Sequence, residues 1–487
     1  MTARLSRLVG HEVSPDPVIA GVTADSRKVR PGFLFAALPG SKVDGRAFVE
    51  GAIAAGAAAI LAPDDVTHSA VPVVHAPDLR RAYALAAAAF HGAQPAACVA
   101  VTGTNGKTSV ATFCRQIFAR LGRKAASMGT LGVTVSAPGV PDVQITPPGL
   151  TTPDAADVAG LMARLATDGV THMALEASSH GIDQRRLDGV RLTAAGFLNL
   201  TQDHLDYHGT MGVYRAAKLR LFEALLPAAG VAVLNADSDQ FETFRDVATQ
   251  AGHPVLSIGE AGGDLRLTSR RLTADGQRLA IVHDGRTHDI RLPLAGAFQA
   301  DNALVAAGLC IAAGEDADAV LAALEHLKGA PGRLQHVGTG PRGGEAYVDY
   351  AHTPDGLETV LKALRPHTAG KLIVVFGAGG DRDRGKRPLM GAAAARLADV
   401  AIVTDDNPRS ESPAVIRAEI LAAAPGVREI GDRREAIRAG VALLGEGDVL
   451  VVAGKGHEQG QLVAGVTHPF DDVAETALAL GLELAHG

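Results

Sequence analysis

The sequence predicts an α/β protein of three domains, on three observations. The chain has 487 residues, more than one core of ordinary size organises, since domains usually hold about 100 to 200 residues. Short apolar runs alternate with helical stretches, which is typical of parallel sheets with crossover helices. The alternation restarts twice after segments that contain Pro and Gly. We therefore expect domains at residues 1–92, 93–330 and 331–487.

Each domain is predicted from its own strands and turns. In the first, short apolar strands and a Pro-Gly turn precede an Ala-rich helix near residues 47–57. Further apolar strands are expected in the segments 98–103, 172–179, 194–200 and 230–237 of the second domain, and in 371–383, 400–409 and 448–458 of the third. The last three run into polar loops. Open α/β sheets bind ligands at the carboxyl ends of their strands, so these loops are candidate sites.

Composition argues against several classes of protein. The net charge is −7 and aromatic residues make up 4%, whereas a nucleic-acid partner would require a basic face. Cys98, Cys114 and Cys310 are widely separated, so neither a disulfide framework nor a zinc knuckle is expected. The apolar runs are too short for a signal peptide or a membrane span. We expect a cytoplasmic protein with no nucleic-acid partner and no membrane span.

The segment TGTNGKTS carries the strongest local signal for a binding site. It follows an apolar strand and precedes a helix. Gly103 and Gly106 allow the backbone N–H groups to turn toward one point, Lys107 adds a cation, and Thr108 offers a hydroxyl for Mg²⁺. Val101 stands where the usual P-loop has its first glycine, so we interpret the segment as a variant nucleotide loop. An incidental glycine turn would not explain strand, loop and helix in this order.

Three residues further along are candidates for metal chemistry, each with a plainer alternative. Glu176 ends an apolar strand, where it is placed like the acid that holds a nucleotide's metal, or it is an ordinary strand-end carboxylate. His204 lies among Asp203, Asp206 and His208, so a metal-binding role and a structural role are about equally supported. From the residues alone, Lys218 is an ordinary helix lysine.

The nucleotide loop leaves the reaction open, because GTPase switches, kinases and ATP-dependent ligases all use one. The guanine-recognition pattern Asn-Lys-x-Asp is missing from the chain. A ligase is the favoured interpretation, and a nucleotide-dependent switch that binds partners without ligating anything is the alternative from another class.

Eight motifs then carry a resemblance to a known family. In chain order they are TGTNGKTS, EASSHG, NLTQDHLDYHG, YRAAK, DNALVAAG, GRLQ, DYAHTPDGL and DNPR. Together they resemble the Mur ligases of peptidoglycan synthesis, and the likeness runs from Asp25 to about Glu458. Within the family they are most similar to the members that add diaminopimelate. The resemblance implies a UDP-binding N-terminal α/β domain, a central P-loop-type ATPase domain with a parallel sheet, and a C-terminal Rossmann-like domain that binds the amino acid.

The resemblance also implies a reaction and its substrates. ATP, with Mg²⁺, would activate the D-Glu side-chain carboxylate of UDP-N-acetylmuramoyl-L-Ala-D-Glu as an acyl phosphate, which the amine of meso-diaminopimelate then attacks. The implied catalytic residues are Lys107, Glu176, His204 and Lys218, the last carrying CO₂ as a carbamate. The implied metal ligands are Thr108, Glu176, His204 and the Lys218 carbamate. We expect a monomer.

The remaining implied site residues fall into three groups. For ATP they are Gly103, Thr104, Asn105, Gly106, Lys107, Thr108, Ser109, Asn302, Arg333 and Asp349. For the UDP-linked dipeptide they are Ala24, Ser26, Ser41, Lys42, Val43, Thr151, Thr152, Ser178, Gln184 and Arg186, although Leu150 replaces an Asn that some relatives carry before the two threonines. For diaminopimelate they are Arg382, Asp406, Asn407, Pro408, Arg409, Gly454 and Glu458.

The DNPR motif decides between the two closest alternatives within the ligases. Diaminopimelate has a distal carboxylate and ammonium, so its site needs a planar cationic donor such as Arg409 and acids such as Asp406 and Glu458. Lysine-adding relatives have other residues in place of the Arg. A folylpolyglutamate synthase shares the ATP loop, and the N-terminal unit with its DSR and PGFLFAALPG segments argues against it.

Overall fold

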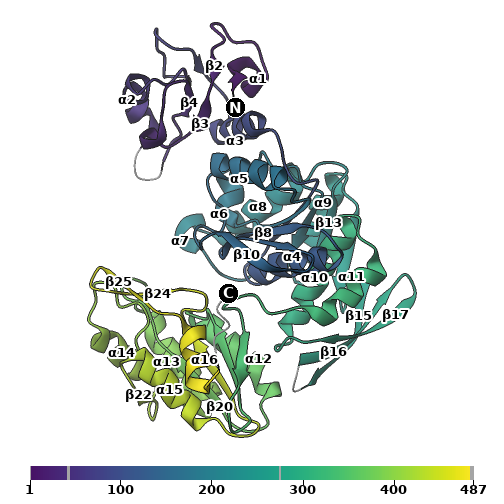
Figure 1. The fold of residues 1–487 in the computed structure, drawn as a ribbon, viewed down its shortest axis with the longest axis vertical. Coiled ribbons are helices and arrows are strands. Elements are labelled where there is room, and N and C mark those ends of the chain that lie inside the picture. The colour runs from purple at the N-terminus through teal and green to yellow at the C-terminus, as the bar shows by residue number, and fades with distance from the viewer. Residues whose placement is uncertain (1, 41–43, 274–275, 483–487) are drawn as a thin grey trace. The chain divides into compact units, whose positions relative to one another are not determined.

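The computed structural model describes residues 2–40, 44–273 and 276–482 (Figure 1). The chain divides into two compact units, Met1–Arg266 with Leu304–Val320, and Leu267–Ala303 with Leu321–Gly487. Three main sheets flanked by helices follow one another along the chain, so the predicted α/β class is confirmed. The predicted boundaries at residues 92 and 330 remain a prediction. None of the helices in these described ranges combines the length and apolar character that crossing a membrane requires.

The N-terminal sheet is small and entirely parallel. Its order is β3 (Gly21–Thr23), β4 (Phe33–Ala36), β5 (Ala59–Leu61) and β6 (Val73–Val74). Around it lie β1 (Ala3–Arg4), α1 (Leu5–Val9), β2 (Val18–Ile19), η1 (Ser26–Lys28), η2 (Gly45–Phe48), α2 (Val49–Ala54) and α3 (Leu79–His91). Alternate residues of β4 face opposite cores, Leu34 with Tyr83 and Phe35 with Val49, because strand side chains alternate between faces. Helices therefore cover both sides of this sheet.

The central sheet has a parallel core, as predicted. In spatial order the parallel strands are β8 (Ala125–Gly129), β11 (His172–Glu176), β7 (Ala97–Thr102), β12 (Ala194–Phe197), β13 (Val231–Asn235) and β14 (Val255–Gly259). The helical segments are α4 (Lys107–Arg120), α5 (Ala155–Thr167), α6 (Ser179–Asp183), α7 (Leu205–His208), α8 (Met211–Arg220), η3 (Leu221–Leu225), α9 (Phe241–Gln250), α10 (Phe298–Ala312), α11 (Ala317–Ala323) and η4 (Leu324–His326). β7 is thus central, with neighbours on both sides.

Further strands extend this sheet at both edges, which the sequence analysis did not anticipate. At one edge β9 (Gly132–Ala137) pairs antiparallel with β8, and β10 (Val140–Thr146) pairs antiparallel with β9. At the other edge β15 (Leu265–Thr273) pairs parallel with β14, and β16 (Gly276–His283) and β17 (Arg286–Leu292) pair antiparallel with each other. The β16–β17 turn is Asp284-Gly285, with φ of +47° and +75°. An Asp-Gly pair between two alternating runs is a strong hairpin signal, so this hairpin was readable from the sequence.

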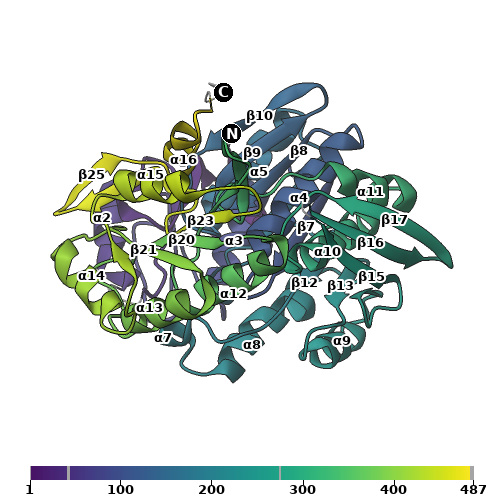
Figure 2. The same cartoon turned by 90° about the horizontal axis from the view of Figure 1, so that it is seen from below.

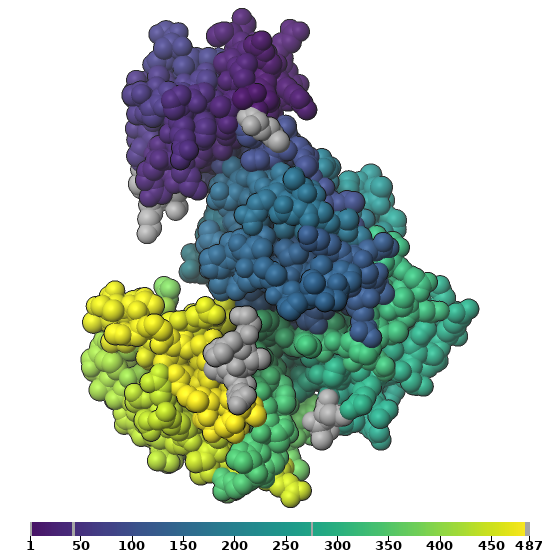
Figure 3. Space-filling model, in the orientation of Figure 1, coloured from purple at the N-terminus to yellow at the C-terminus, as the bar shows by residue number. Residues whose placement is uncertain are grey.

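The C-terminal sheet has the order β18 (Gln335–Thr339), β19 (Glu345–Asp349), β23 (Val449–Ala453), β20 (Leu372–Phe376), β21 (Val400–Val403) and β22 (Arg428–Glu429), and only β18 is antiparallel. Figure 2 shows α12 (Pro354–Leu364), α13 (Lys386–Leu397) and α14 (Pro413–Leu421) on one face, with α15 (Arg433–Leu443) and α16 (Asp472–Leu480) on the other. η5 (Arg365–His367) follows α12. The hairpin of β24 (Gly460–Val463) and β25 (Val466–Pro469) contributes, with α16, the yellow surface in Figure 3. The three strands predicted in this domain are confirmed.

Candidate active site

The nucleotide loop joins β7 to α4, as the sequence predicts. Gly106 has φ of +88°, a conformation that glycine adopts without the strain a Cβ would cause. The Lys107 Nζ folds back and donates to the carbonyl oxygens of Gly103 and Thr104, 2.8 Å from each. The N–H groups of Thr104 and Asn105 donate to Asn199 Oδ1. A phosphate here would therefore use the first turn of α4, whose N–H groups have no acceptor within the helix.

A buried carboxylate lies beside the start of α4. Glu176 ends β11, whose neighbour is β7, and its side chain is nearly inaccessible, with 2% exposed. Its Oε2 accepts from Thr108 Oγ1 at 3.1 Å, and its Oε1 accepts from the Thr130 backbone N–H at 2.9 Å. A Cβ on Gly129 would overlap the Glu176 side chain, so that position requires glycine. A carboxylate and a hydroxyl side by side are the hard oxygen ligands that Mg²⁺ prefers, so these residues fit such an ion.

Lys218 is buried against the same loop. Only 1% of it is exposed, its Nζ donates to Gly103 O at 2.8 Å, and the nitrogen lies 4.4 Å from the ring centroid of Tyr214. Burial, and then the charge of Lys107, holds the pKa of Lys218 well below its usual value. The interpretation of Lys218 as an ordinary helix lysine is therefore wrong. Tyr214 and Lys218 are four residues apart on α8, so their side chains lie on the same face of the helix. The sequence spacing does not show that this face packs against the nucleotide loop.

The side chains around His204 do not converge on one point. His204 has φ of +53° and a half-exposed ring that contacts His180 edge to face, with ring centroids 5.0 Å apart. His208 is buried instead, with Nε2 3.0 Å from Ser179 Oγ. Among the described residues, no three His, Cys, Asp or Glu side chains are arranged to hold a metal ion. The acidic and histidine-rich segment is thus not a metal site by itself, and a role for His204 stays a prediction.

Most residues expected to hold the dipeptide contact one another. Thr152 Oγ1 lies 2.9 Å from Ser178 Oγ, and Arg186 donates to Thr152 O at 2.6 Å and to Gln184 Oε1 at 2.7 Å. Thr151 Oγ1 lies 2.9 Å from Thr130 Oγ1, which links this group to Glu176. These side chains therefore adjoin the carboxylate at the nucleotide loop.

Two of the residues expected to hold the UDP end, Ala24 and Ser26, follow strand β3 of the N-terminal sheet. The Ala24 N–H donates to the Tyr83 hydroxyl at 3.2 Å, and Ser26 begins η1, which Asp25 caps. Leu150 is exposed and precedes the two threonines. Ser41, Lys42 and Val43 lie outside the described residues.

The three nucleoside-side residues all have partners of their own. Asn302 Nδ2 donates to Gln299 Oε1 at 2.9 Å, and the Arg333 guanidinium lies 4.3 Å from the ring centroid of Tyr350. The Asp349 carboxylate accepts from two backbone N–H groups, those of Leu334 and Ala351, and burial raises its pKa. Their relation to a nucleotide stays a prediction.

The DNPR segment follows β21, and one of its carboxylate oxygens has no hydrogen-bond donor among the described residues. Asp406 is buried, and its Oδ2 has no hydrogen-bond partner among the described residues. A Cβ on Gly454, which has φ of +123°, would overlap that oxygen. A buried carboxylate oxygen without a donor is costly, so a ligand ammonium would stabilise it. Asp406 and Gly454 therefore fit the role that the sequence assigns to them.

The side-chain amide of Asn407 is hydrogen-bonded through both its nitrogen and its oxygen, and one of these bonds goes to Glu458. Its Nδ2 donates to Glu458 Oε2 at 2.8 Å, and its Oδ1 accepts from Lys455 Nζ at 3.0 Å and from the Leu462 N–H at 2.9 Å. Lys455 is completely buried and lies 3.3 Å from Glu458 Oε2. Sequence reasoning missed Lys455. Its spacing of three from Glu458 in GKGHE was the available signal.

Arg409 is held from two sides. Its backbone N–H donates to Leu462 O at 2.9 Å, and its Nη1 donates to Gly380 O at 2.8 Å. The backbone has φ of +54°, a left-handed conformation that is unusual for an arginine. Arg382 lies exposed in the neighbouring loop, and Pro408 is buried. The structure thus brings the residues expected to bind diaminopimelate to one edge of the C-terminal sheet.

Comparison with known families agrees with these elements. Models described as the Mur ligase family catalytic domain, the Mur ligase middle domain and the Mur ligase glutamate ligase domain match residues 18–99, 101–310 and 332–456. The chain belongs to the Mur ligase family.

Individual relatives carry a more specific name. The UDP-N-acetylmuramoyl-L-alanyl-D-glutamate--2,6-diaminopimelate ligase of Caulobacter vibrioides is 73% identical over 481 residues, which cover 99% of both chains. The protein of the same name from Brucella melitensis is 54% identical over 96% of this chain and 95% of its own. A solved structure of a protein with this name is 34% identical, with a TM-score of 0.75 over 99% of both chains. MurF of Acinetobacter baumannii, at 21% identity over 92% of this chain and 94% of its own and a TM-score of 0.62, shares the fold.

Proposed function

We propose that this chain is an ATP-dependent ligase that joins meso-diaminopimelate to the D-Glu side-chain carboxylate of UDP-N-acetylmuramoyl-L-Ala-D-Glu. The full-length identity of 73% to a relative with that printed name supports the reaction. The observation within the fold that carries the proposal is the Asp406 Oδ2 without a hydrogen-bond partner, in the same loop as Arg409, because such an oxygen would be stabilised by an ammonium and Arg409 can bind a carboxylate.

At the nucleotide loop, the chain supplies charge and hydrogen bonds to the phosphates of ATP. Lys107 and the N–H groups of the first turn of α4 would contact the transferring γ-phosphate, assisted by Thr104, Asn105 and Ser109. Thr108, Glu176, His204 and Lys218 would hold Mg²⁺, which neutralises phosphate charge when bound. Asn302, Arg333 and Asp349 are proposed for the nucleoside side.

The residues around Thr152 are proposed to hold the acyl donor, the UDP-linked dipeptide. Thr151, Thr152, Ser178, Gln184 and Arg186 orient the dipeptide so that a D-Glu carboxylate oxygen attacks the γ-phosphorus. The bond to the β,γ-bridging oxygen breaks, giving ADP and an acyl phosphate. Ala24, Ser26 and the loop of residues 41–43 are proposed for the UDP end.

The C-terminal loops bring the nucleophile. Arg382 and Arg409 take the distal carboxylate of diaminopimelate, and Asp406 and Glu458 take the distal ammonium. The other amine attacks the acyl carbon, loses its proton, and expels phosphate as the amide bond forms. Asn407, Pro408 and Gly454 shape this site, since Asn407 fixes Glu458 and Gly454 leaves room for Asp406.

Lys218 is proposed to carry CO₂ as a carbamate. Its ammonium would lie beside the Lys107 charge, the Gly103 carbonyl and the proposed metal ligands, where a second cation is unfavourable. A carbamate converts that cation into an anionic oxygen ligand. Because ATP and the nucleotide-linked acceptor are cytoplasmic metabolites, we place the reaction in the cytoplasm, and we expect a monomer in solution.

Phosphate release from the purified protein tests the proposal. We expect release only when ATP, the UDP-linked dipeptide and diaminopimelate are all present with Mg²⁺, and a product mass that shows one new amide bond. Lysine that replaces diaminopimelate with equal efficiency would indicate a lysine-adding ligase. Phosphate release without either co-substrate would favour a nucleotide switch and contradict the proposal.

A further inference from the structure

A buried arginine in α13, Arg387, has no role in the proposed reaction. Arg387 is completely buried, and its side-chain hydrogen bonds among the described residues go to Glu411, Glu419 and Gly379, none of which is proposed to contact a substrate. Its Nη1 donates to Glu411 Oε2 at 2.9 Å and its Nη2 donates to Glu411 Oε1 at 2.7 Å, a bidentate pair. The same Nη2 lies 3.3 Å from Gly379 O. The Arg387 Nε has no hydrogen-bond partner among the described residues, so the contacts of the two Nη atoms compensate this buried charge, and removing one of their partners is costly.

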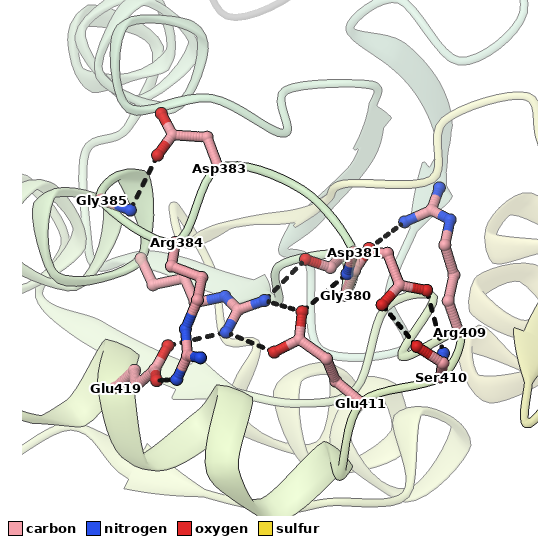
Figure 4. A network of polar contacts seen from close by, with 11 residues as sticks. Gly380, Asp381, Asp383, Arg384, Gly385, Arg409, Ser410, Glu411 and Glu419 are labelled. Carbon is pink, nitrogen blue, oxygen red and sulfur yellow. Dashed lines mark hydrogen bonds and ion pairs between the residues drawn. The ribbon is translucent and has the colours of Figure 1, made fainter.

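Glu411 connects two loops that lie side by side. The loop of residues 377–385 follows β20, and the loop of residues 404–411 follows β21, the parallel neighbour of β20. Glu411 belongs to the second loop, and its Oε1 accepts the backbone N–H of Asp381 in the first, at 2.6 Å (Figure 4). One carboxylate therefore joins the buried guanidinium to the backbone of the opposite loop.

Four more hydrogen bonds join the two loops at the same junction. The Asp381 carboxylate accepts from the Ser410 N–H at 3.1 Å and from Ser410 Oγ at 2.6 Å. The Gly380 N–H donates to Asn407 O at 2.9 Å, and Gly380 O accepts from Arg409 Nη1 at 2.8 Å. Figure 4 shows Gly380 and Asp381 of the first loop facing Arg409 and Ser410 of the second.

Two residues at this junction have unfavourable backbone conformations, which surrounding contacts must stabilise. Asp381 and Arg409 both have left-handed φ values, +53° and +54°, which side chains with a Cβ rarely adopt. A Cβ on Gly380 would overlap Pro408 O, and a Cβ on Gly379 would come within 2.6 Å of Arg409 Nη1. The two loops are thus held closer together than ordinary residues permit.

We infer that Arg387 and Glu411 form a clamp that fixes Arg409 relative to Arg382 and thereby sets the preference for an amino acid with a distal carboxylate. The inference rests on the proposed function. Both are positioning residues, because they act through the loops. Glu411→Gln keeps one acceptor oxygen but replaces the other with an NH2 donor, so the side chain can no longer accept from both Nη atoms of Arg387 and from the Asp381 N–H. The Asp381 loop is then held less firmly, and the Gly380 carbonyl no longer fixes the Arg409 guanidinium. Bidentate binding of a carboxylate depends steeply on such orientation, and a displacement of about 1 Å can cost about 10²-fold in rate.

Glu419 offers a matched control for Glu411. It lies on α14, and its Oε2 accepts from the same Arg387 Nη1 at 2.6 Å, while its Oε1 pairs with Arg384. No bond from the Glu419 side chain to the backbone of either loop is present among the described residues. Glu411→Gln and Glu419→Gln therefore each remove one charge from Arg387, and only the first disturbs the bridge to Asp381.

The experiment measures kcat and KM for all three substrates, and the ratio of kcat/KM for diaminopimelate to that for lysine, which lacks the distal carboxylate. For Glu411→Gln we expect the KM for diaminopimelate to rise about 10-fold or more and the ratio to fall similarly, with the KM for ATP unchanged within about 2-fold. For Glu419→Gln we expect the ratio to stay within about 2-fold of wild type. A Glu411→Gln ratio equal to that of Glu419→Gln would overturn the clamp.

A second variant covers the case in which Glu411→Gln does not fold. Replacing both partners, Arg387→Met with Glu411→Leu, leaves no unpaired buried charge at Arg387, and Glu419 keeps Arg384 as its partner. We expect the same loss of discrimination in this folded variant, and retained discrimination would overturn the clamp. If the wild-type enzyme shows no turnover that depends on diaminopimelate, the proposed function fails, and the clamp fails with it. If the wild-type enzyme prefers diaminopimelate and both variants keep that preference, the clamp is rejected and the proposed function stands.

Discussion

The nucleotide loop and the C-terminal loops hold their functional groups in different ways. At the nucleotide loop, Lys107 and Lys218 both donate to the carbonyl oxygen of Gly103, so the backbone of one short segment positions two cations. At the C-terminal loops, Arg409 is oriented by Gly380, whose loop is held in turn by Glu411 and Arg387. In the first region, backbone carbonyl groups of one loop position the cations. In the second region, side chains from separate elements hold the loop that orients Arg409.

This difference predicts how substitutions distribute their effects. A change at the nucleotide loop removes charge where phosphoryl transfer occurs, so it lowers kcat for every amino acid. A change at the C-terminal loops alters the fit of one substrate, so it changes the KM for diaminopimelate and spares ATP. The two regions are therefore separable by kinetics.

The largest effect is expected at Lys107. Lys107→Ala removes a cation of the nucleotide loop, and we expect turnover to fall by at least about 10³-fold, with the fold intact. Phosphate release and thermal unfolding measure the two quantities. Lys362→Ala, which removes an exposed lysine paired with Glu358 on α12, is the control and should leave turnover unchanged. Normal turnover in Lys107→Ala would remove the loop from the mechanism.

A slightly smaller effect is expected at Lys218. Lys218→Ala removes the proposed carbamate, and we expect turnover to fall about 10²- to 10³-fold. Added acetate should restore part of the activity, because it can supply the missing carboxylate oxygens to Mg²⁺. Lys107→Ala is the control, since acetate cannot replace a cation and should not rescue it. Full activity of Lys218→Ala without acetate would exclude the carbamate.

Arg409 tests the other side of the comparison. Loss of a bidentate charged contact costs about 1.5 to 3 kcal/mol, so Arg409→Ala should weaken kcat/KM for diaminopimelate about 10- to 150-fold. The KM for ATP should change by less than about 2-fold, because Arg409 acts on the amino acid alone. Arg396→Ala, an exposed arginine paired with Glu358, is the control. Equal losses for ATP and diaminopimelate would mean that Arg409 is structural.

The smallest effect is expected at Tyr214, which shares α8 with Lys218 and contacts the nucleotide loop. Its hydroxyl is 3.3 Å from Thr104 Oγ1, and one neutral hydrogen bond contributes about 0.5 to 1.5 kcal/mol, so Tyr214→Phe should lower kcat about 2- to 10-fold. Burial raises the pKa of Tyr214 to about 12, so the phenol stays neutral below that value. The loss should therefore be the same at pH 7 and pH 9. A loss that grows toward pH 9 would show that the phenol ionises in that range.

The sequence was most informative where a site is local. The strand, loop and helix around Lys107 were predictable, because one continuous segment contains all three and its glycines have a geometric purpose. The polar strand ends that gather at the edge of the C-terminal sheet were also predictable, since parallel strands end together. The burial of Lys218 was not, because it depends on α8 packing against a loop more than one hundred residues earlier in the chain.

Contacts between separate elements account for the other omissions. Lys455 holds Asn407 across 48 residues, and Arg387 meets Glu411 across 24. Nothing in the composition of either segment indicates its partner, because these bonds exist only after neighbouring strands have aligned. The β16–β17 hairpin is a different case, because its Asp-Gly turn is a local sequence signal from which the hairpin could have been predicted.

Product analysis of one reaction tests the central claim most directly. The wild-type enzyme is incubated with ATP, Mg²⁺, the UDP-linked dipeptide and an equimolar mixture of diaminopimelate and lysine, and the products are separated by mass. We predict that the diaminopimelate product accounts for nearly all of the amide formed, with one ADP and one phosphate per product. Equal amounts of the two products, or ADP formed without either product, would contradict the account.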